Sequence, residues 1–236
     1  MLSEDDLALM SDQAEESSAL AKQIKTPPRL FSSTGSSTLF EWDWCGPTSG
    51  RPKSSISSGG GNIWSLAANA TGTTLALGCE DGGIRLVNLW DGEFEVVKCL
   101  DRVNTRLLSI AWGPQAPISR RQDLKGKGRE TEEAQTNANE DVYVVVGCAD
   151  SSVRKWDVRS GRCTSKMKTD KSGREHTLVW SVAVLKDHTI VSGDSMGFVR
   201  FWDGIMGIQH IGYRAHQADV LCLTVSSVRP SSLRKS

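Results

Sequence analysis

The densest group of side chains able to do chemistry is a basic stretch between residues 154 and 174. Lysine and arginine can neutralise phosphates, which gives affinity for a nucleic acid without reading its sequence. The stretch is therefore a candidate phosphate or RNA contact. A solvated outer surface is the alternative, since no aromatic residue follows Trp156 within the stretch to stack on bases. Its cations, opposed within it only by Asp157 and Asp170, are Arg154, Lys155, Arg159, Arg162, Lys166, Lys168, Lys171 and Arg174.

The chain as a whole gives no further reason to expect a charged ligand. Its 236 residues include 28 Lys and Arg and 28 Asp and Glu, so any binding of an anionic partner must be local. The six cysteines form no CxxC pair and have no histidine at metal-ligand spacing, which predicts reduced, intracellular thiols and no metal. The acidic N-terminus and the lack of an apolar run of about 18 residues predict neither secretion nor a membrane span.

Catalytic motifs are missing from the sequence. It contains no GxSxG elbow, no HExxH motif and no kinase-type glycine loop. The run from Gly59 to Gly61 lacks the Lys-Ser/Thr of a phosphate-cradling loop and precedes a strand pattern rather than a helix. We therefore expect a non-enzymatic protein with no cofactor and no small-molecule substrate.

Three short patterns recur along the chain and indicate β-strands. The first, in which apolar residues alternate with other types, occupies residues 63–67, 107–111, 179–183 and 220–224. The second runs into a tight turn at 75–82, 144–151 and 190–197, and the third starts with a β-branched residue and an arginine at 84–88, 153–157 and 199–203. A period of two suits a strand with one buried face. Each set of three patterns therefore predicts successive strands of one sheet.

The spacing of these patterns predicts the fold. The glycines of the second pattern, Gly78, Gly147 and Gly193, are 69 and 46 residues apart, and without a polar insertion at 115–140 the first interval is about 43 residues. This is the period of a WD40 repeat. Trp42 precedes Val87 of the third pattern by 45 residues, so the segment 40–43 is predicted to be the third strand of a preceding blade. We predict an all-β fold over residues 38–228: a WD40 β-propeller, present as an incomplete arc of about three full blades plus partial flanking blades.

Several repeat positions have structural interpretations. Asp81 and Asp150 follow the second strand and are expected to anchor turns. The corresponding residue of the last blade is Met196, which predicts a turn without that side-chain clamp. One blade cannot cover both its faces, so the tryptophans are expected to fill the layers between blades. The repeat positions are Trp42, Trp64, Trp156, Trp180 and Trp202, with Asp157 and Asp203 completing two Trp-Asp pairs.

Segments outside the patterns are expected to be irregular. Residues 1–37 begin with an acidic run and are predicted to be flexible, and residues 45–61 are rich in Gly, Pro and Ser, which predicts a connecting loop. The charged insertion at 115–140 is predicted to be disordered, and residues 229–236 form a basic tail.

The ordered patterns also resemble the cirhin family, WD40 proteins associated with U3 small nucleolar RNA. The similar segments are 61–68 with 77–86, 106–114, and 179–183 with 187–203, and the resemblance covers about residues 38–225 apart from the insertion. It corresponds to part of the first of two tandem propellers in that family.

The resemblance implies a nucleolar scaffold of the small-subunit processome, acting in pre-ribosomal RNA transcription and processing. The implied partners are other WD40 proteins of a processome subcomplex and pre-rRNA or U3 small nucleolar RNA, and the family has no catalytic residues to carry over. The alternative is a general WD40 protein-interaction adaptor, such as a ubiquitin-ligase receptor or a signalling scaffold.

Overall fold

The computed structural model describes residues 28–46, 49–114, 143–170 and 175–226. These residues form two compact units, of which the first contains strands β1–β3 and the second contains β4–β15 together with residues 35–37. The predicted insertion at 115–140, the basic tail and most of the N-terminal segment lie outside the described residues. No described helix is long and apolar enough to span a membrane.

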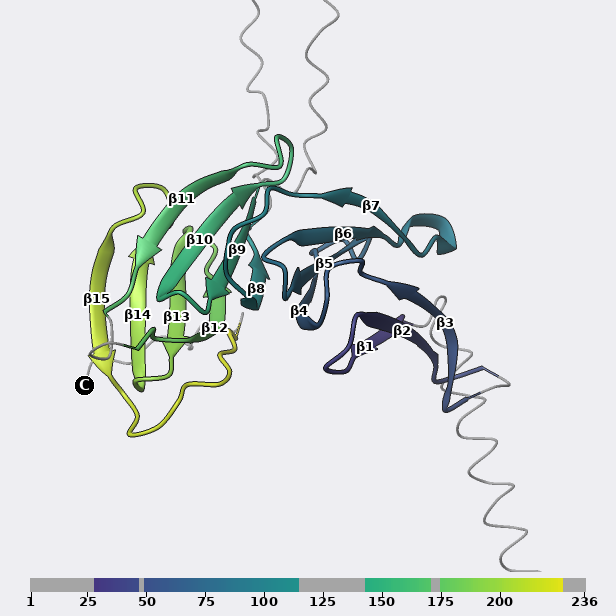
Figure 1. Ribbon diagram of the computed structural model, residues 1–236, viewed down its shortest axis with the longest axis horizontal. Coiled ribbons are helices and arrows are strands. Elements are labelled where there is room, and N and C mark those ends of the chain that lie inside the picture. Colours follow the sequence, from purple (N-terminus) through teal and green to yellow (C-terminus); the bar gives the residue numbers. More distant parts are fainter. Residues whose placement is uncertain (1–27, 47–48, 115–142, 171–174, 227–236) are drawn as a thin grey trace, which may run out of the picture. The chain divides into compact units, whose positions relative to one another are not determined.

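The second unit consists of three antiparallel four-stranded sheets, each in simple sequential order (Figure 1). The predicted all-β fold with three full WD40-type blades is confirmed. The β4–β7 blade contains β4 (Ile63–Ala68), β5 (Thr74–Cys79), β6 (Ile84–Asn88) and β7 (Glu95–Cys99), with a 3-10 turn at Trp90–Gly92. The β8–β11 blade contains β8 (Leu107–Trp112), β9 (Tyr143–Cys148), β10 (Ser152–Asp157) and β11 (Cys163–Lys168). The β12–β15 blade contains β12 (Val179–Val184), β13 (Thr189–Asp194), β14 (Phe198–Asp203) and β15 (Gln209–Arg214).

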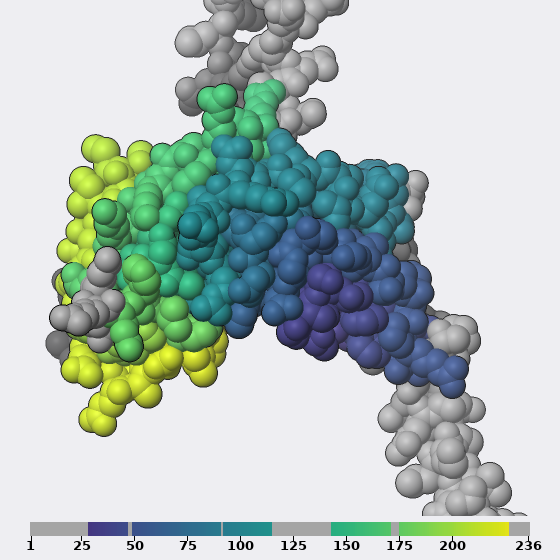
Figure 2. Space-filling view, viewed as in Figure 1, coloured from purple at the N-terminus to yellow at the C-terminus, as the bar shows by residue number. Residues whose placement is uncertain are grey.

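Apolar layers join these blades because the central blade is covered on both faces. Val144 and Val146 of β9 belong to the layer shared with the β4–β7 blade, whereas Tyr143 and Val145 belong to the layer shared with the β12–β15 blade. Burial on both faces explains why β9 is an unbroken apolar run rather than an alternating one. Figure 2 shows the first junction on the surface, where teal residues near 100 adjoin green residues near 150.

A repeated hydrogen bond fastens each blade to the chain that follows it. The Ser109 hydroxyl donates to the carbonyl oxygen of Val179 at 3.2 Å, and the Ser181 hydroxyl donates to that of Val220 at 2.9 Å. Ser65 makes the same bond to Leu107 at 3.4 Å. The glycine paired with each serine lies beneath this contact, so a Cβ there would overlap the hydroxyl and crowd the chain that follows the blade. The recurring serines and glycines are therefore packing residues of the junction.

The fourth copy of the first pattern, at 220–224, does not form the expected strand of a later blade. Val220 is buried and its amide donates to the Asp194 carbonyl oxygen at 3.0 Å, but Leu221 is exposed and no described strand lies beside the segment. A strand requires a hydrogen-bonded neighbour, so here only the first residue of the pattern docks.

The first unit is a sheet of three strands in the order β1 (Leu30–Ser33), β2 (Thr38–Asp43) and β3 (Arg51–Ser57). The preceding blade is thus more complete than predicted. The prediction of a connecting loop over 45–61 is wrong at 51–57, and β1 lies inside the segment expected to be flexible. Ser54 and Ile56 pair with Glu41 and Leu39, both buried on β2, and an edge strand tolerates a proline.

The tryptophans do not all occupy the layers between blades. Trp156 and Trp202 are buried in the two layers. The prediction is wrong for Trp64, which is 39% exposed, hydrogen-bonds Glu80 and lies under the Arg106 guanidinium. Trp64 is the extra residue of a β-bulge, and Trp180, which is half-buried and donates to Asp219, occupies the same place in β12. A bulge interrupts the strand alternation on which the prediction rested. Trp42 is also half-buried and donates to the Ser32 hydroxyl at 2.7 Å.

Candidate nucleic-acid interface

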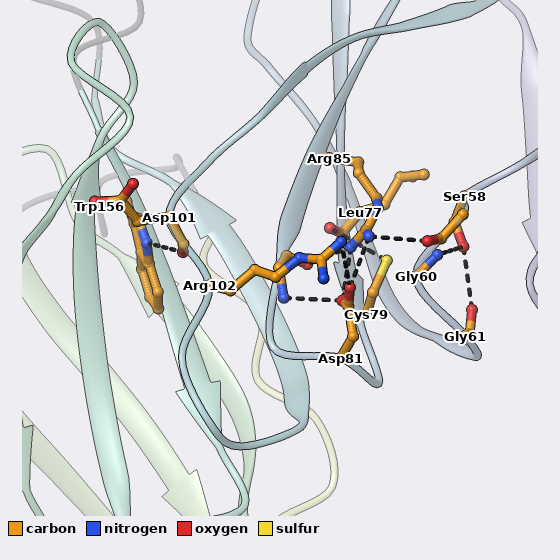
Figure 3. Close-up of polar contacts among 12 residues, drawn as sticks. Ser58, Gly60, Gly61, Leu77, Cys79, Asp81, Arg85, Asp101, Arg102 and Trp156 are labelled. Carbon is orange, nitrogen blue, oxygen red and sulfur yellow. Dashed lines mark hydrogen bonds and ion pairs between the residues drawn. The ribbon is translucent and has the colours of Figure 1, made fainter.

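The arginine of the third pattern forms an internal clamp in every complete blade. In the β4–β7 blade the Arg85 guanidinium donates two hydrogen bonds of 2.7 Å to the two oxygens of Asp81 (Figure 3). Arg102 approaches the same carboxylate at 3.1 Å, and the Gly83 amide donates to it at 3.0 Å. These hydrogen bonds, chiefly those from Arg85, lower the pKa of Asp81. Asp81 thus anchors its turn through a bidentate pair.

The glycine run before β4 accommodates this clamp. The Gly59 carbonyl oxygen accepts a hydrogen bond from Arg85 at 3.2 Å, and a Cβ on Gly60 would overlap the guanidinium. Figure 3 shows the loop of Ser58, Gly60 and Gly61 beside the Arg85 guanidinium. The run therefore cradles a side chain of its own blade.

The clamp of the β8–β11 blade removes Arg154 from the free cations of the basic stretch. Arg154 donates to Asp150 at 2.6 Å and to the Ser152 hydroxyl at 3.1 Å. Burial alone would raise the pKa of Asp150, but hydrogen bonds from Ser152, Lys166 and Arg154 lower it to about 2. The Arg154 charge is therefore matched within its own blade.

In the β12–β15 blade the clamp is displaced rather than lost. Asp194, at the end of β13, accepts hydrogen bonds from the amides of Met196 at 2.9 Å and Phe198 at 3.1 Å. Its carboxylate lies 3.4 Å from the Arg200 guanidinium, and both residues are almost fully buried. The prediction of a turn without a clamp at Met196 is therefore wrong. Asp194 occupies the repeat position of the buried Cys79 and Cys148, two residues before the usual aspartate, which is the sequence signal for the displacement.

Lys155 is also committed to the fold. Its ammonium donates to the carbonyl oxygen of Gly204 in the neighbouring blade at 2.7 Å and lies 4.3 Å from the centre of the Tyr143 ring. Burial lowers the pKa of Lys155. This lysine therefore joins two blades.

The aspartates of the Trp-Asp pairs organise the turn between third and fourth strands. The Asp157 carboxylate accepts from the Ser160 amide at 2.6 Å, and hydrogen bonds from the Ser160 side chain and amide lower the pKa of Asp157. Asp203 accepts from the amides of Ile205 and Met206 at 2.8 Å. These are local turn bonds of the kind that aspartate side chains make readily.

The remaining cations of the basic stretch divide between the two ends of β11. Arg159 and Arg162 lie in the turn before the strand, whereas Lys166 and Lys168 lie toward its far end. All four are exposed, and only Lys166 has a partner among the described residues, at 3.0 Å from Asp150. Lys171 and Arg174 lie outside the described residues.

The turn that carries Arg159 is fixed by the preceding blade. The Lys98 ammonium donates to the carbonyl oxygens of Val158 and Arg159 at 2.8 and 2.7 Å. A cavity of about 410 Å³ opens beside it, lined by Lys98, Arg159 and threonines of the β4–β5 turn. The structure thus presents the two arginines on a supported turn.

Consecutive antiparallel sheets, shared apolar layers and a repeated arginine clamp define a segment of a WD40-type β-propeller. A computationally designed protein named Ika8 shows the same fold, with a TM-score of 0.58 and 17% identity over 86% of this chain and 51% of its own. No protein-family model matches the chain.

The sequence is similar to proteins named U3 small nucleolar RNA-associated protein 4. Identity is 33% over 207 residues of the Saccharomyces cerevisiae protein, 33% over 204 residues of the Schizosaccharomyces pombe protein and 29% over 207 residues of the human homolog. These matches cover 84–86% of this chain but only 23–26% of the relatives, so the chain spans about a quarter of their length. The family resemblance expected from the sequence is thus confirmed as a partial match.

Proposed function

We propose that this chain is a non-enzymatic scaffold segment of an assembly that contains U3 small nucleolar RNA. Its role would lie in small-subunit processome assembly and in the transcription and processing of pre-ribosomal RNA, in the nucleolus. The observation that carries the proposal is the 28–33% identity, along 84–86% of the chain, to U3 small nucleolar RNA-associated proteins of two yeasts and two mammals. Neighbouring WD40 proteins of a processome subcomplex are the proposed protein partners.

The distribution of charge supports a binding role for the outer surface. The repeat arginines pair with aspartates of their own blades, and Lys155 donates to a carbonyl oxygen of the next blade. The side chains of Arg159, Arg162 and Lys168 make no hydrogen bond or ion pair within the described part of the chain and remain exposed. We propose that these cations, with Lys166, contact the RNA backbone directly.

Co-purification tests the assembly. The tagged chain is expected to recover U3 small nucleolar RNA, pre-ribosomal RNA and other processome proteins from a nuclear extract. The designed Ika8 protein is a suitable control, since it shares the fold at only 17% identity. Recovery of ubiquitin-ligase or signalling proteins without RNA would instead support a general adaptor and contradict the proposal.

Salt dependence tests the direct RNA contact. Glutamine at Arg159, Arg162, Lys166 and Lys168 together should weaken RNA binding and flatten its salt dependence by roughly 0.7 per lost phosphate contact to a single strand. Replacing exposed Lys186 and Arg214 of the next blade serves as the control. An unchanged slope in the fourfold variant would refute this contact surface.

A further inference from the structure

A small recess at the far end of β11 is lined by Thr169, whose hydroxyl has no hydrogen-bond partner among the described residues. The recess has a volume of about 200 Å³ and is lined by Asp150, Ser151, Lys166, Lys168, Thr169 and His176. Its walls come from the β9–β10 turn, from the end of β11 and from the segment that leads into β12. It is thus built from three parts of the chain within the second unit.

Thr169 is the unusual member of this lining. Thr169 is only 6% exposed, and its hydroxyl has no hydrogen-bond partner among the described residues, although its amide donates to the Ser151 carbonyl oxygen at 2.9 Å. Leaving a buried hydroxyl unpaired costs free energy, so such groups usually have a partner. Because Thr169 lines the recess, rotation about its χ1 bond can turn the hydroxyl toward a bound ligand.

The charges around the recess favour an anion. Among the described residues of the lining Asp150 is the one carboxylate, and it is paired with Arg154 at 2.6 Å and Lys166 at 3.0 Å. Lys168 adds a third cation, so Arg154, Lys166 and Lys168 together exceed the single negative charge of Asp150 by two. The neighbouring Asp170 is 82% exposed and lies 3.3 Å from Arg200, which it shares with the buried Asp194, so it reduces the excess of positive charge to one. His176 is exposed and makes no polar contact within the described part of the chain, so it can add a ring N–H donor.

We infer that this recess binds a phosphate group of an RNA backbone, with the Thr169 hydroxyl as hydrogen-bond donor and Lys166 and Lys168 as counter-charges. The inference rests on the proposed RNA contact and assigns it a defined site. A phosphopeptide carries one phosphate, whereas the second group of cations, Arg159 and Arg162, lies at the other end of a six-residue strand, roughly 20 Å away. A ligand with regularly repeated phosphates can engage both groups.

The test compares variants for binding to a labelled single-stranded RNA over a range of salt concentrations. Thr169→Val should weaken binding about tenfold, while Thr169→Ser, which keeps the hydroxyl, should bind as the wild type does. Lys168→Gln should reduce the salt slope by about 0.7. Lys186→Gln removes an exposed lysine of the adjacent blade and should have a much smaller effect.

Urea unfolding of Thr169→Val distinguishes a binding role from a structural one. Since the hydroxyl is buried and unpaired, its removal should leave stability unchanged or higher while RNA affinity falls. A parallel loss of stability and affinity would show that the threonine supports the fold, and would overturn the site.

The other outcomes separate the recess from the function on which it rests. If Thr169→Val and Lys168→Gln bind RNA normally while Arg159→Gln/Arg162→Gln does not, the recess is refuted and the RNA contact stands. If the wild-type chain binds no RNA, both are refuted. A phosphoserine peptide that binds more tightly than RNA, with the same dependence on Thr169, would assign the recess to a protein and overturn the RNA assignment.

Discussion

Replacing Asp194 by cysteine tests the displaced clamp of the β12–β15 blade. Cysteine is the residue that the other two blades have at this position, so the substitution itself fits the repeat. It removes the carboxylate that lies 3.4 Å from Arg200 and accepts the amides of Met196 and Phe198. Both members of the pair are 1% exposed, so the variant leaves a buried guanidinium without its main counter-charge.

The expected cost follows from this burial. Breaking a buried ion pair by removing one partner costs about 3–5 kcal/mol. Asp170 stays 3.3 Å from Arg200 but is 82% exposed, which places the expected loss toward the lower end, about 3 kcal/mol. For a chain of this size, that corresponds to a fall in Tm of roughly 6–12 °C.

A second substitution should repair the loss. Met196→Asp places a carboxylate four residues before Arg200, the spacing of Asp81 to Arg85 and of Asp150 to Arg154. It can also accept from the Phe198 amide, as Asp81 accepts from the Gly83 amide. Asp194→Cys/Met196→Asp should therefore recover most of the stability. Urea unfolding followed by tryptophan fluorescence under reducing conditions measures both variants. A double variant no more stable than the single one would refute the equivalence of the two clamps.

Three further predictions address the junctions, the acid limit and the tryptophans. Gly147→Ala should destabilise the chain by about 1–3 kcal/mol in urea unfolding, because its Cβ would lie 2.5 Å from the Val179 carbonyl oxygen, whereas Gly35→Ala meets no atom within 4 Å and should be neutral. The pKa of Asp150, lowered to about 2 from 3.8, predicts about 2 kcal/mol of stability that is present above pH 4 and disappears as the pH falls through 2; urea midpoints across this range should show no such step in Asp150→Asn. Trp156→Ala should cost about 3–5 kcal/mol by calorimetry, and an equal cost for Trp64→Ala would contradict the assignment of that side chain to the surface.

The strands that the sequence predicts well are the first three of each complete blade. Alternation and spacing place β4–β6, β8–β10 and β12–β14 because these strands are held by both burial and pairing. The strand at 51–57 cannot be recognised from its sequence, which is rich in Ser and contains Pro. It pairs with β2 alone and has few partly buried side chains, so it requires no apolar alternation. An alternating pattern also cannot predict the β-bulge that exposes Trp64.

The candidate interface could be predicted only in part, because charge along the sequence does not reveal pairing across a turn. Arg154 and Lys155 contribute to a basic stretch on paper, yet one is matched by Asp150 and the other by a carbonyl oxygen of the next blade. The recess around Thr169 has no sequence signature, since its lining comes from three separate segments. What could have been inferred is the displacement of the last clamp, because an aspartate replaces cysteine there.

Repetition in this chain provides a criterion for separating structural from binding residues. A residue type that recurs at one position in every blade serves the blade itself, as the junction serines and the clamp arginines do. Arg159, Arg162 and Lys166 have no cationic equivalent in the other complete blades, whereas Lys168 on β11 corresponds to Arg214 on β15. Removing Arg154, which recurs in every complete blade, and Lys155, which joins two blades, reduces the described members of the basic stretch to the four at the ends of β11. The four cations proposed to contact RNA are therefore exposed residues outside the repeated clamp and junction positions, and all of them lie on the hairpin of β10 and β11.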